Sequence, residues 1–490
     1  MKRINELFDV EEDFKILSLH SDSRYVGKDS IFFCVEGLST DGHKYADDAV
    51  FQGAKCIVHS KPLKREYPGV LYIQVNDVLA ELNRVANIFY DYPSYKMTVF
   101  GVTGTSGKTI VSLMIRDVLG HYIRMGYMGT NDSQFDNRIV HSPYTTPEPI
   151  YLHRTLNEMV KANVKGVSLE VSSYGLTLHR VDSIDFDVAI FTNLYPENLD
   201  FHGTLENLMR AYAKLFIRLD EKNTVILNAD SVVFNHYLQT NEVIKAKIIT
   251  YGIEHHADIM AHDIREFIDH TEFILLLDGH MFDVSVPILG GFNVPMVLAL
   301  IAALKSMEMP LEQIIEALQY IKPIDGRMEL LETNQPFDVL IDYCAYIHSY
   351  KNIFKFARKV KRGKGRIIAV FGPSGSRNDE REAEIARLAN AYCDQVILTE
   401  QDGRIDNIQE ACEKMQKYIT RPVSVIITNR RIAISQAIEL ACKDDIILIL
   451  GKGHEQFMAS SLSNIPYPGD KYVAKSAIDM IFRGGNEDEI

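Results

Sequence analysis

Residues 101–109, GVTGTSGKT, combine three glycines with a lysine and a threonine, and these residue types together suit the binding of phosphate. The glycines permit tight turns and let backbone N–H groups approach phosphate oxygens at the start of a helix. Lys108 would reach the β- and γ-phosphates of a nucleotide, and the Thr109 hydroxyl would bind Mg²⁺. The loop therefore predicts ATP binding. The ATP-binding residues that it contributes are Gly104, Thr105, Ser106, Gly107, Lys108 and Thr109.

One position departs from the usual phosphate-loop spacing. The strict pattern has a glycine where this chain has Val102. A glycine turn with a solvated lysine is the structural alternative. The order of strand, loop, Gly-Lys-Thr and helix favours the nucleotide-binding interpretation.

A magnesium nucleotide needs further oxygen ligands, which phosphate-loop enzymes commonly take from an acid at the end of another core strand. Glu170 ends the apolar run KGVSLE that begins at residue 165, so it is the candidate. A helix-capping role is the alternative, because the following EVSS could begin a helix. Together with the phosphate loop, Thr109 and Glu170 form the predicted metal site, and Lys108 and Glu170 are the predicted catalytic pair.

The elements that must position these residues change in pattern along the chain. Up to about residue 96, short strand-like runs and a helical pattern from 77 predict a compact α/β module. From 97, buried strands with helical spacers predict a parallel sheet covered on both faces, carrying the phosphate loop. After a helical stretch at 294–319, the alternation restarts at 338 as a third, Rossmann-like domain. The predicted fold is α/β with three domains, 1–96, 97–322 and 323–490.

Composition excludes several classes of protein. The 490 residues are 46% apolar and 24% charged, which is typical of a packed globular chain. No stretch approaches the roughly 18 apolar residues of a membrane span, and acidic residues near the start argue against a secretory signal, so we expect a cytoplasmic protein. The net charge of −14 opposes non-specific nucleic-acid binding. The six cysteines lack the spacing of a zinc site or a disulfide framework.

Further short motifs extend the phosphate loop into a series. The ordered motifs are DSR (22–24), DGH (41–43), TTPE (145–148), EVSS (170–173), FTNL (191–194), LDFHG (199–203), GFN (291–293), DGR (325–327), DY (342–343) and GKGHE (451–455). In this order, nearly end to end, the sequence resembles the Mur ligases, specifically the MurE branch. Folylpolyglutamate-synthase-like ligases share the two later domains but lack the first module.

The resemblance implies an ATP- and Mg²⁺-dependent ligase. It would add an amino acid to UDP-N-acetylmuramoyl-L-alanyl-D-glutamate through an acyl phosphate, in the peptidoglycan synthesis that underlies cell-wall biogenesis, cell shape and cell division. The partners implied are the UDP-muramyl dipeptide and an amino acid, with the enzyme a monomer. The alternative is a catalytically weakened paralogue that binds UDP-muramyl peptide or ATP in a regulatory or non-peptidoglycan role.

The resemblance also implies residue roles, each carried by a matching motif position. For the UDP-muramyl substrate these are Ser23, His43, Thr145, Thr146, Ser172 and Arg180. For ATP, from the later part of the chain, they are Asn293, Arg327 and Asp342. For the incoming amino acid they are Arg377, Asp402, Arg404, Gly451 and Glu455.

Several positions depart from the family pattern. Asn198 stands where the family has a histidine, and Tyr212 stands where it has a lysine that is carbamylated, both of which serve a second magnesium. Tyr174 replaces the histidine after EVSS, and Ala345 lies in an altered DY region. The amino-acid selector becomes QDGR at 401–404, so the resemblance leaves the acceptor open between lysine, diaminopimelate and another amine.

Overall fold

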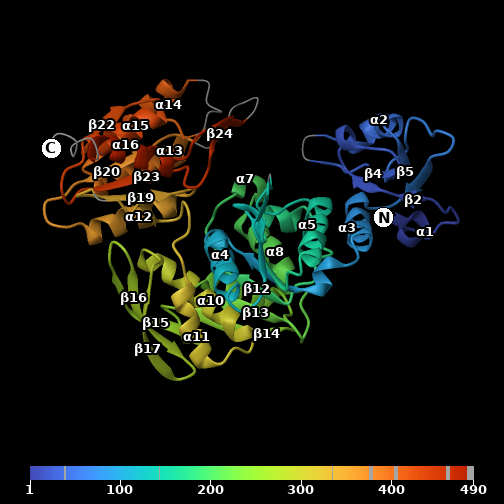
Figure 1. Cartoon of the computed structure of the whole chain (residues 1–490), viewed down its shortest axis with the longest axis horizontal. Coiled ribbons are helices and arrows are strands. Elements are labelled where there is room, and N and C mark those ends of the chain that lie inside the picture. Colours follow the sequence, from blue (N-terminus) through green and yellow to red (C-terminus); the bar gives the residue numbers. More distant parts are fainter. Residues whose placement is uncertain are drawn as a thin grey trace, which may run out of the picture. The chain divides into compact units, whose positions relative to one another are not determined.

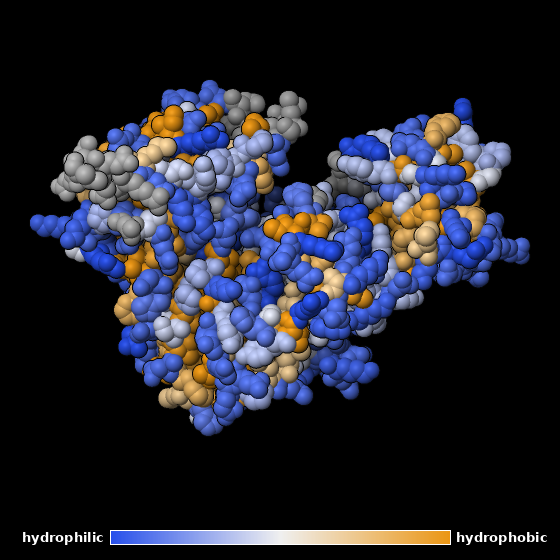
Figure 2. Space-filling view, viewed as in Figure 1, coloured by the Kyte–Doolittle hydropathy of each residue, from blue (hydrophilic) through white to orange (hydrophobic). Residues whose placement is uncertain are grey.

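The computed structural model describes residues 1–37, 40–142, 144–333, 335–374, 379–401, 407–459 and 464–482. The chain divides into two compact units, residues 1–255 with 299–311, and residues 256–298 with 312–490, and each is described by itself. Figure 1 labels the elements along the chain. On the face shown in Figure 2, hydrophilic residues predominate. None of the helices among the described residues has the length and apolar composition that a membrane crossing requires.

The first unit begins with a small α/β module. Its four parallel strands are β3 (Ser18–His20), β4 (Ser30–Phe33), β5 (Ala54–His59) and β6 (Leu71–Gln74), in that order. A short antiparallel pair joins β1 (Lys2–Arg3) to β2 (Lys15–Ile16). The helices are α1 (Ile4–Leu7), α2 (Ala46–Phe51) and α3 (Val78–Phe89), with turns η1 (Ser23–Tyr25), η2 (Gly42–Tyr45) and η3 (Pro93–Lys96).

Both faces of this small sheet are covered, because its strands are apolar on both sides. Ile31 and Phe33 pack with α1 and α3, while Phe32 packs in a second cluster with Ala49 of α2. Strict alternation of side chains along β4 separates the two clusters. The module predicted for the first 96 residues therefore has the expected α/β layers.

The central sheet of the first unit carries the phosphate loop. Its strand order is β10-β9-β8-β11-β7-β12-β13-β14, and these strands are parallel except β9, which pairs antiparallel with both β8 and β10. The strands are β7 (Thr98–Thr103), β8 (Met125–Gly129), β9 (Asp132–Phe135), β10 (Arg138–Val140), β11 (Gly166–Glu170), β12 (Val188–Phe191), β13 (Thr224–Asn228) and β14 (Lys247–Gly252). The helices are α4 (Lys108–Leu119), α5 (Pro149–Lys161), α6 (Ser173–Thr177), α7 (Leu199–His202), α8 (Leu205–Phe216) and α9 (Val232–Asn241).

Alternation along β11 shows how this sheet is covered on both faces. Val167 and Leu169 lie in the apolar core shared with α5, α8 and α9. Ser168 points to the other face, where its hydroxyl donates a 2.6 Å hydrogen bond to the Ser112 carbonyl of α4. Glu170 follows Ser168 by two residues and therefore lies on the α4 face.

The second unit contains an antiparallel meander and a Rossmann-like sheet. The meander is β15 (Ile259–Glu266), β16 (Thr271–Leu277) and β17 (His280–Val286). The sheet order is β18-β19-β23-β20-β21-β22, with only β18 antiparallel among its paired strands. Its strands are β18 (Glu329–Leu330), β19 (Asp338–Asp342), β20 (Ile367–Phe371), β21 (Gln395–Leu398), β22 (Val423–Ile426) and β23 (Ile446–Leu450). A hairpin pairs β24 (Phe457–Ala459) with β25 (Asn464–Pro466).

Two apolar clusters cover the two faces of this sheet, as the doubly wound prediction requires. Leu340 packs with residues of α12, α13 and α14, whereas Ile341 packs with residues of α15 and α16. These helices are α12 (Ile347–Val360), α13 (Asp379–Tyr392), α14 (Ile408–Gln416), α15 (Arg430–Glu439) and α16 (Asp470–Phe482).

The stretch predicted as helical at 294–319 consists of more than one helix. It is divided into α10 (Val294–Ser306), α11 (Leu311–Ala317) and the turn η5 (Leu318–Tyr320), preceded by the turn η4 (Gly291–Asn293). Pro310 lies in the break, and a proline disfavours the helical conformation of the residue before it. Glu308 adopts a positive φ of 57°, which also ends a helix.

Candidate functional site

The phosphate loop leaves β7 and enters α4 in the conformation that its glycines allow. Gly104 and Gly107 have φ values of 127° and 82°, a region that favours glycine. A Cβ at Gly104 would also collide with the Thr192 hydroxyl. The main-chain N–H of Ser106 donates a 3.0 Å hydrogen bond to the Asn193 side chain, which ties the loop to the end of β12. The strand, loop and helix order predicted for these residues is confirmed.

Lys108 lies at the first position of α4. Its Nζ donates hydrogen bonds to the carbonyl oxygens of Gly104 and Thr105, at 2.8 and 3.0 Å. The ammonium group is therefore held over the loop, where the γ-phosphate of a nucleotide is expected. Thr105 is itself fixed, because its hydroxyl accepts a 3.0 Å hydrogen bond from the Tyr195 N–H.

Glu170 ends β11 beside the first turn of α4. The Thr109 hydroxyl donates a 3.0 Å hydrogen bond to Oε2 of Glu170, and both residues are buried. Glu170 does not cap a helix, because the side chain of Ser172 caps α6 by accepting from the Gly175 N–H at 3.1 Å. The helix-capping alternative for Glu170 is thereby excluded.

Thr109 and Glu170 fit a magnesium ion. Bonds of about 2.1 Å at right angles put neighbouring ligand oxygens roughly 3 Å apart around Mg²⁺. The Thr109 oxygen and Glu170 Oε2 have this separation, at 3.0 Å. A hydroxyl and a carboxylate are also the hard oxygen donors that Mg²⁺ prefers.

Four residues predicted to bind the muramyl peptide gather next to Glu170. The Thr146 hydroxyl donates to the Glu170 carbonyl at 2.9 Å and accepts from the Ser172 N–H at 2.8 Å. Arg180 donates to the Thr146 carbonyl at 2.8 Å, and the Thr145 hydroxyl lies 3.1 Å from that of Thr130. Burial lowers the pKa of Arg180. The network links TTPE and EVSS directly to the candidate metal ligand.

The two residues predicted for the uridine nucleotide lie in the turns of the first module. Ser23 begins η1, and His43 lies in η2. His43 Nε2 accepts a 3.0 Å hydrogen bond from the Ser60 N–H, so Nδ1 carries the proton and donates to Asp41 at 2.6 Å. This bond holds the pKa of Asp41 well below its ordinary value.

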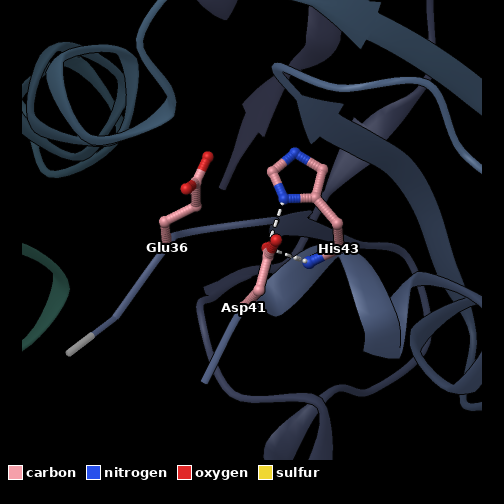
Figure 3. Close-up of side chains that lie close together, drawn as sticks. All are labelled: Glu36, Asp41 and His43. Carbon is pink, nitrogen blue, oxygen red and sulfur yellow. Dashed lines mark hydrogen bonds and ion pairs between the residues drawn. The ribbon is translucent and has the colours of Figure 1, made fainter. Parts of the chain in front are cut away.

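Glu36, Asp41 and His43 lie close enough together to hold a metal ion, as Figure 3 shows. The two carboxylates already have a cation, because Lys61 Nζ lies 2.9 Å from Glu36 and 3.1 Å from Asp41. We therefore interpret the cluster as a scaffold that fixes the tautomer and orientation of His43.

In the second unit, Arg327 and Asp342 lie near each other. The Arg327 guanidinium lies over the Tyr343 ring, 4.4 Å from its centroid. Asp342 accepts hydrogen bonds from the main-chain N–H groups of Met328 and Cys344, and burial raises its pKa while the Arg327 charge opposes the rise. Asn293 is buried and donates to the Leu289 carbonyl at 2.8 Å.

The residues predicted for the incoming amino acid are only partly described. Arg377, Asp402 and Arg404 lie outside the described residues. Gly451 follows β23, and a Cβ there would collide with the side chain of Gln401. Glu455 pairs with the buried ammonium of Lys452.

Of the two altered positions that would serve a second magnesium, Tyr212 lies in the apolar core. Tyr212 is 1% exposed and packs in the central apolar core, with its ring 5.7 Å from that of Phe191. Tyr174 stacks on Phe201, with ring centroids 4.1 Å apart. Asn198 precedes α7 with a φ of 58°.

The remaining altered position, Ala345, lies in the second unit. Its carbonyl accepts a 2.8 Å hydrogen bond from Arg381.

Sequence reasoning missed two residues at this site. The Tyr127 hydroxyl donates a hydrogen bond to the Glu170 carboxylate. Thr130 donates to the same carboxylate through both its N–H and its hydroxyl. Both belong to β8 or the turn after it, a strand that we did not predict. The short apolar run MGYMG, closed by a threonine, is the signal that would have indicated a strand end at this edge of the sheet.

The fold and this site define an ATP-using ligase of the Mur type, and comparison with known proteins agrees. Three family models match: "Mur ligase family, catalytic domain" at residues 15–90, "Mur ligase middle domain" at 102–304, and "Mur ligase, glutamate ligase domain" at 326–453. The chain belongs to the Mur ligase family, as the motif series predicted.

Individual relatives point to one branch. The chain is 35% identical over 467 residues to the UDP-N-acetylmuramoyl-L-alanyl-D-glutamate–2,6-diaminopimelate ligase of Halalkalibacterium halodurans, covering 94% of both proteins. It is 35% identical to the ligase of the same name from Caldanaerobacter subterraneus, covering 91% of both.

Solved structures support the fold. One titled as a ligase of this same kind covers 98% of the chain and 99% of the solved chain, with a TM-score of 0.69 at 24% identity. The MurF ligase of Thermotoga maritima in complex with ADP covers 96% of the chain and 98% of its own, with a TM-score of 0.66 at 18% identity.

Proposed function

We propose that the protein is an ATP-dependent ligase that joins an amino acid to UDP-N-acetylmuramoyl-L-alanyl-D-glutamate in the synthesis of peptidoglycan precursors. One observation carries the proposal. Ser172 and Arg180 each donate a hydrogen bond to Thr146, whose hydroxyl donates to the main-chain carbonyl of Glu170 beside the phosphate loop. The peptide carboxylate and the γ-phosphate would therefore meet at one place. The names of the relatives support the same substrate.

The reaction follows from these positions. A carboxylate oxygen of the peptide attacks the γ-phosphorus, and the bond to ADP breaks. The amine nitrogen of the incoming amino acid then attacks the acyl carbon, the bond to phosphate breaks, and the nitrogen loses a proton. Lys108 and the N–H groups at the start of α4 stabilise the charge on the transferring phosphoryl group. Mg²⁺, when held by Thr109 and Glu170, neutralises the charge of the nucleotide phosphates.

Substrate contacts from other parts of the chain complete this proposal. Ser23 and His43 would hold the uridine nucleotide. Asn293, Arg327 and Asp342 would contact ATP, and Arg377, Asp402, Arg404, Gly451 and Glu455 would hold the incoming amino acid. The domains that correspond to these tasks are 1–96, 97–322 and 323–490. We further propose that the enzyme is a cytoplasmic monomer that binds no nucleic acid.

The proposal leaves the identity of the incoming amino acid to experiment. Both relatives described above are named for 2,6-diaminopimelate, so this amino acid is the first acceptor to test. Gln401 begins the altered QDGR segment, and its amide donates to the Gly451 carbonyl at 3.2 Å. That side chain occupies the space in front of Gly451, so an acceptor of different shape from that of the relatives is the second possibility.

Phosphate release from ATP tests the proposal. The purified protein is incubated with Mg²⁺-ATP, UDP-N-acetylmuramoyl-L-alanyl-D-glutamate and each of a panel of amino acids that includes diaminopimelate and lysine. We expect phosphate release, and a UDP-linked tripeptide by mass spectrometry, with at least one acceptor. Reactions without acceptor or without the UDP substrate are the controls. Tight binding of the UDP substrate with no turnover for any acceptor would favour the regulatory paralogue.

A further inference from the structure

The two carboxylate oxygens of Glu170 have different surroundings. Oε1 accepts a hydrogen bond from the Tyr127 hydroxyl and a 3.0 Å hydrogen bond from the Thr130 N–H. Oε2 accepts from the hydroxyls of Thr109 and Thr130, at 3.0 and 3.1 Å. The carboxylate is completely buried. Oε1 is thus held by the end of β8 and the following turn, and Oε2 faces the hydroxyl beside the phosphate loop.

The direction of the Tyr127 hydrogen bond is fixed by its neighbour. The Tyr127 hydroxyl accepts a 3.1 Å hydrogen bond from the Asn131 N–H, which can only donate. The phenolic proton is therefore available to Glu170. The Thr130 N–H is likewise a donor only, so Oε1 accepts two hydrogen bonds whose direction cannot reverse.

The backbone around Tyr127 is adapted to this contact. A Cβ at Gly129 would collide with both Glu170 Oε1 and the Tyr127 hydroxyl, so a larger residue there would separate the two groups. The Tyr127 ring is itself fully buried, and the Arg116 guanidinium lies over it, 6.0 Å from the centroid. The ring therefore has little freedom to move away from the carboxylate.

We propose that Tyr127 is a positioning residue for the metal ligand Glu170. By holding Oε1, it leaves Oε2 as the oxygen presented, next to the Thr109 hydroxyl, to the divalent cation of the nucleotide. This inference rests on the proposed function, in which Thr109 and Glu170 hold the cation. Groups that orient a metal ligand through a hydrogen bond commonly change metal affinity by about 10- to 100-fold when removed.

Binding of Mn²⁺ tests the inference without turnover. Free Mn²⁺ is followed by electron paramagnetic resonance as it is titrated into the full-length protein with a non-hydrolysable ATP analogue. For Tyr127→Phe, which removes only the hydroxyl, we expect the Mn²⁺ dissociation constant to rise about tenfold. We expect the affinity for the analogue in the presence of EDTA to stay within about twofold of that of the wild type, because the phosphate loop is unchanged.

Tyr251→Phe is the matched control. Tyr251 is also fully buried in the first unit, and its hydroxyl donates to the Phe191 carbonyl at 2.8 Å rather than to Glu170. Both variants lose one buried hydroxyl of the same sheet together with the hydrogen bonds that this hydroxyl makes. We expect Tyr251→Phe to bind Mn²⁺ as the wild type does. Equal weakening in both variants would show a general structural effect and overturn the inference.

A double-mutant cycle with Glu170→Gln tests the route of the effect. If Tyr127 acts through Glu170, Tyr127→Phe will change Mn²⁺ affinity by less than about twofold in the Glu170→Gln background. A full tenfold change in that background would overturn the inference, as would wild-type Mn²⁺ affinity in the single variant. Failure of the wild-type protein to bind Mn²⁺ with the analogue would instead contradict the metal site of the proposed function.

Discussion

The hydroxyl of Thr109 and Oε2 of Glu170 are 3.0 Å apart although the residues are separated by 61 positions in the sequence. They meet because β7 and β11 are neighbouring parallel strands in which Glu170 lies opposite Val102. The loop that follows one strand and the acid that ends the other are then at the same edge of the sheet. This is the edge at which ligands bind in parallel α/β sheets.

Lys108 should be essential for turnover and dispensable for folding. Its Nζ donates hydrogen bonds to two loop carbonyls, so Lys108→Met removes the charge from the phosphate loop while keeping a side chain of similar length. Loss of one preorganised group that stabilises transition-state charge typically costs about 10²- to 10³-fold in rate. We expect a fall of this size in phosphate release, with the wild-type circular dichroism spectrum retained. A variant with near wild-type turnover would show that Lys108 does not contact the transferring phosphoryl group.

Restoring a lysine at position 212 should destabilise the protein. Tyr212 lies among the rings of Phe191 and Phe234, so Tyr212→Lys places an ammonium group in an apolar core. An unpaired buried charge costs about 3 kcal/mol or more. We expect a markedly lower melting temperature, whereas Tyr212→Phe should change stability by about 1 kcal/mol or less.

The opposite result would be informative about the metal. A Tyr212→Lys protein that keeps the wild-type melting temperature and gains activity with bicarbonate would show that position 212 opens onto the nucleotide. The same measurements on Asn198→His, alone and combined with Tyr212→Lys, separate the contributions of the two altered positions.

The ion pair of Arg430 and Asp470 should be far more sensitive to truncation than surface pairs. Both side chains are fully buried and make two hydrogen bonds of 2.7 Å with each other. Asp470→Ala leaves the guanidinium without its counter-charge, and we expect a loss of about 3–5 kcal/mol in the unfolding free energy of the second unit. Glu206→Ala breaks the exposed pair with Arg210 and should cost less than about 1 kcal/mol. Equal effects of the two substitutions in urea titrations would contradict this expectation.

His153 should make the protein sensitive to mild acid. It is fully buried, neither ring nitrogen has a hydrogen-bond partner among the described residues, and burial lowers its pKa from 6.5 to about 4. Because the unfolded state takes up the proton first, the contribution is fully present above pH 6.5 and is lost as the pH falls towards 4. We expect a loss of about 2 kcal/mol at pH 5 from this group.

Removing the imidazole tests the origin of that loss. The difference in melting temperature between pH 7 and pH 5 should be smaller in His153→Leu than in the wild type. His236→Leu, which removes an exposed imidazole, should leave the difference unchanged. A His153→Leu protein with the wild-type pH dependence would show that this histidine is not the group responsible.

Much of the fold could be predicted from strands that are apolar on both sides, because such strands are buried only in a sheet that helices cover on both faces. β11 illustrates this, because Gly166–Glu170 lies within the predicted apolar run KGVSLE that begins at residue 165. The meander β15–β17 was not predicted, although Phe273, Leu275 and Leu277 alternate with partly exposed residues. Alternation of this kind also occurs in surface segments, and the pairing partners are what distinguish a sheet.

The site residues that lie in recognisable motifs could be predicted from the sequence. Those that reach the site only through tertiary contacts could not. The resemblance to the Mur ligases implied a shared substrate for Thr146, Ser172 and Arg180, and the structure brings these residues together. Tyr127 could not be assigned from sequence, because its contact with Glu170 depends on β8 and β11 being neighbours in the sheet. The sequence of one strand alone does not determine which strand it pairs with or in which register.

The register of β11 has a consequence for how this enzyme tolerates change in length. Ser168 and Glu170 point to the face covered by α4, and Val167 and Leu169 point to the other. Deleting a single residue within β11 would turn the carboxylate away from the phosphate loop and put a polar group in the core. Insertions and deletions along this strand should therefore be absent from functional descendants of the chain, while exposed loops such as that between β5 and β6 remain free to vary in length.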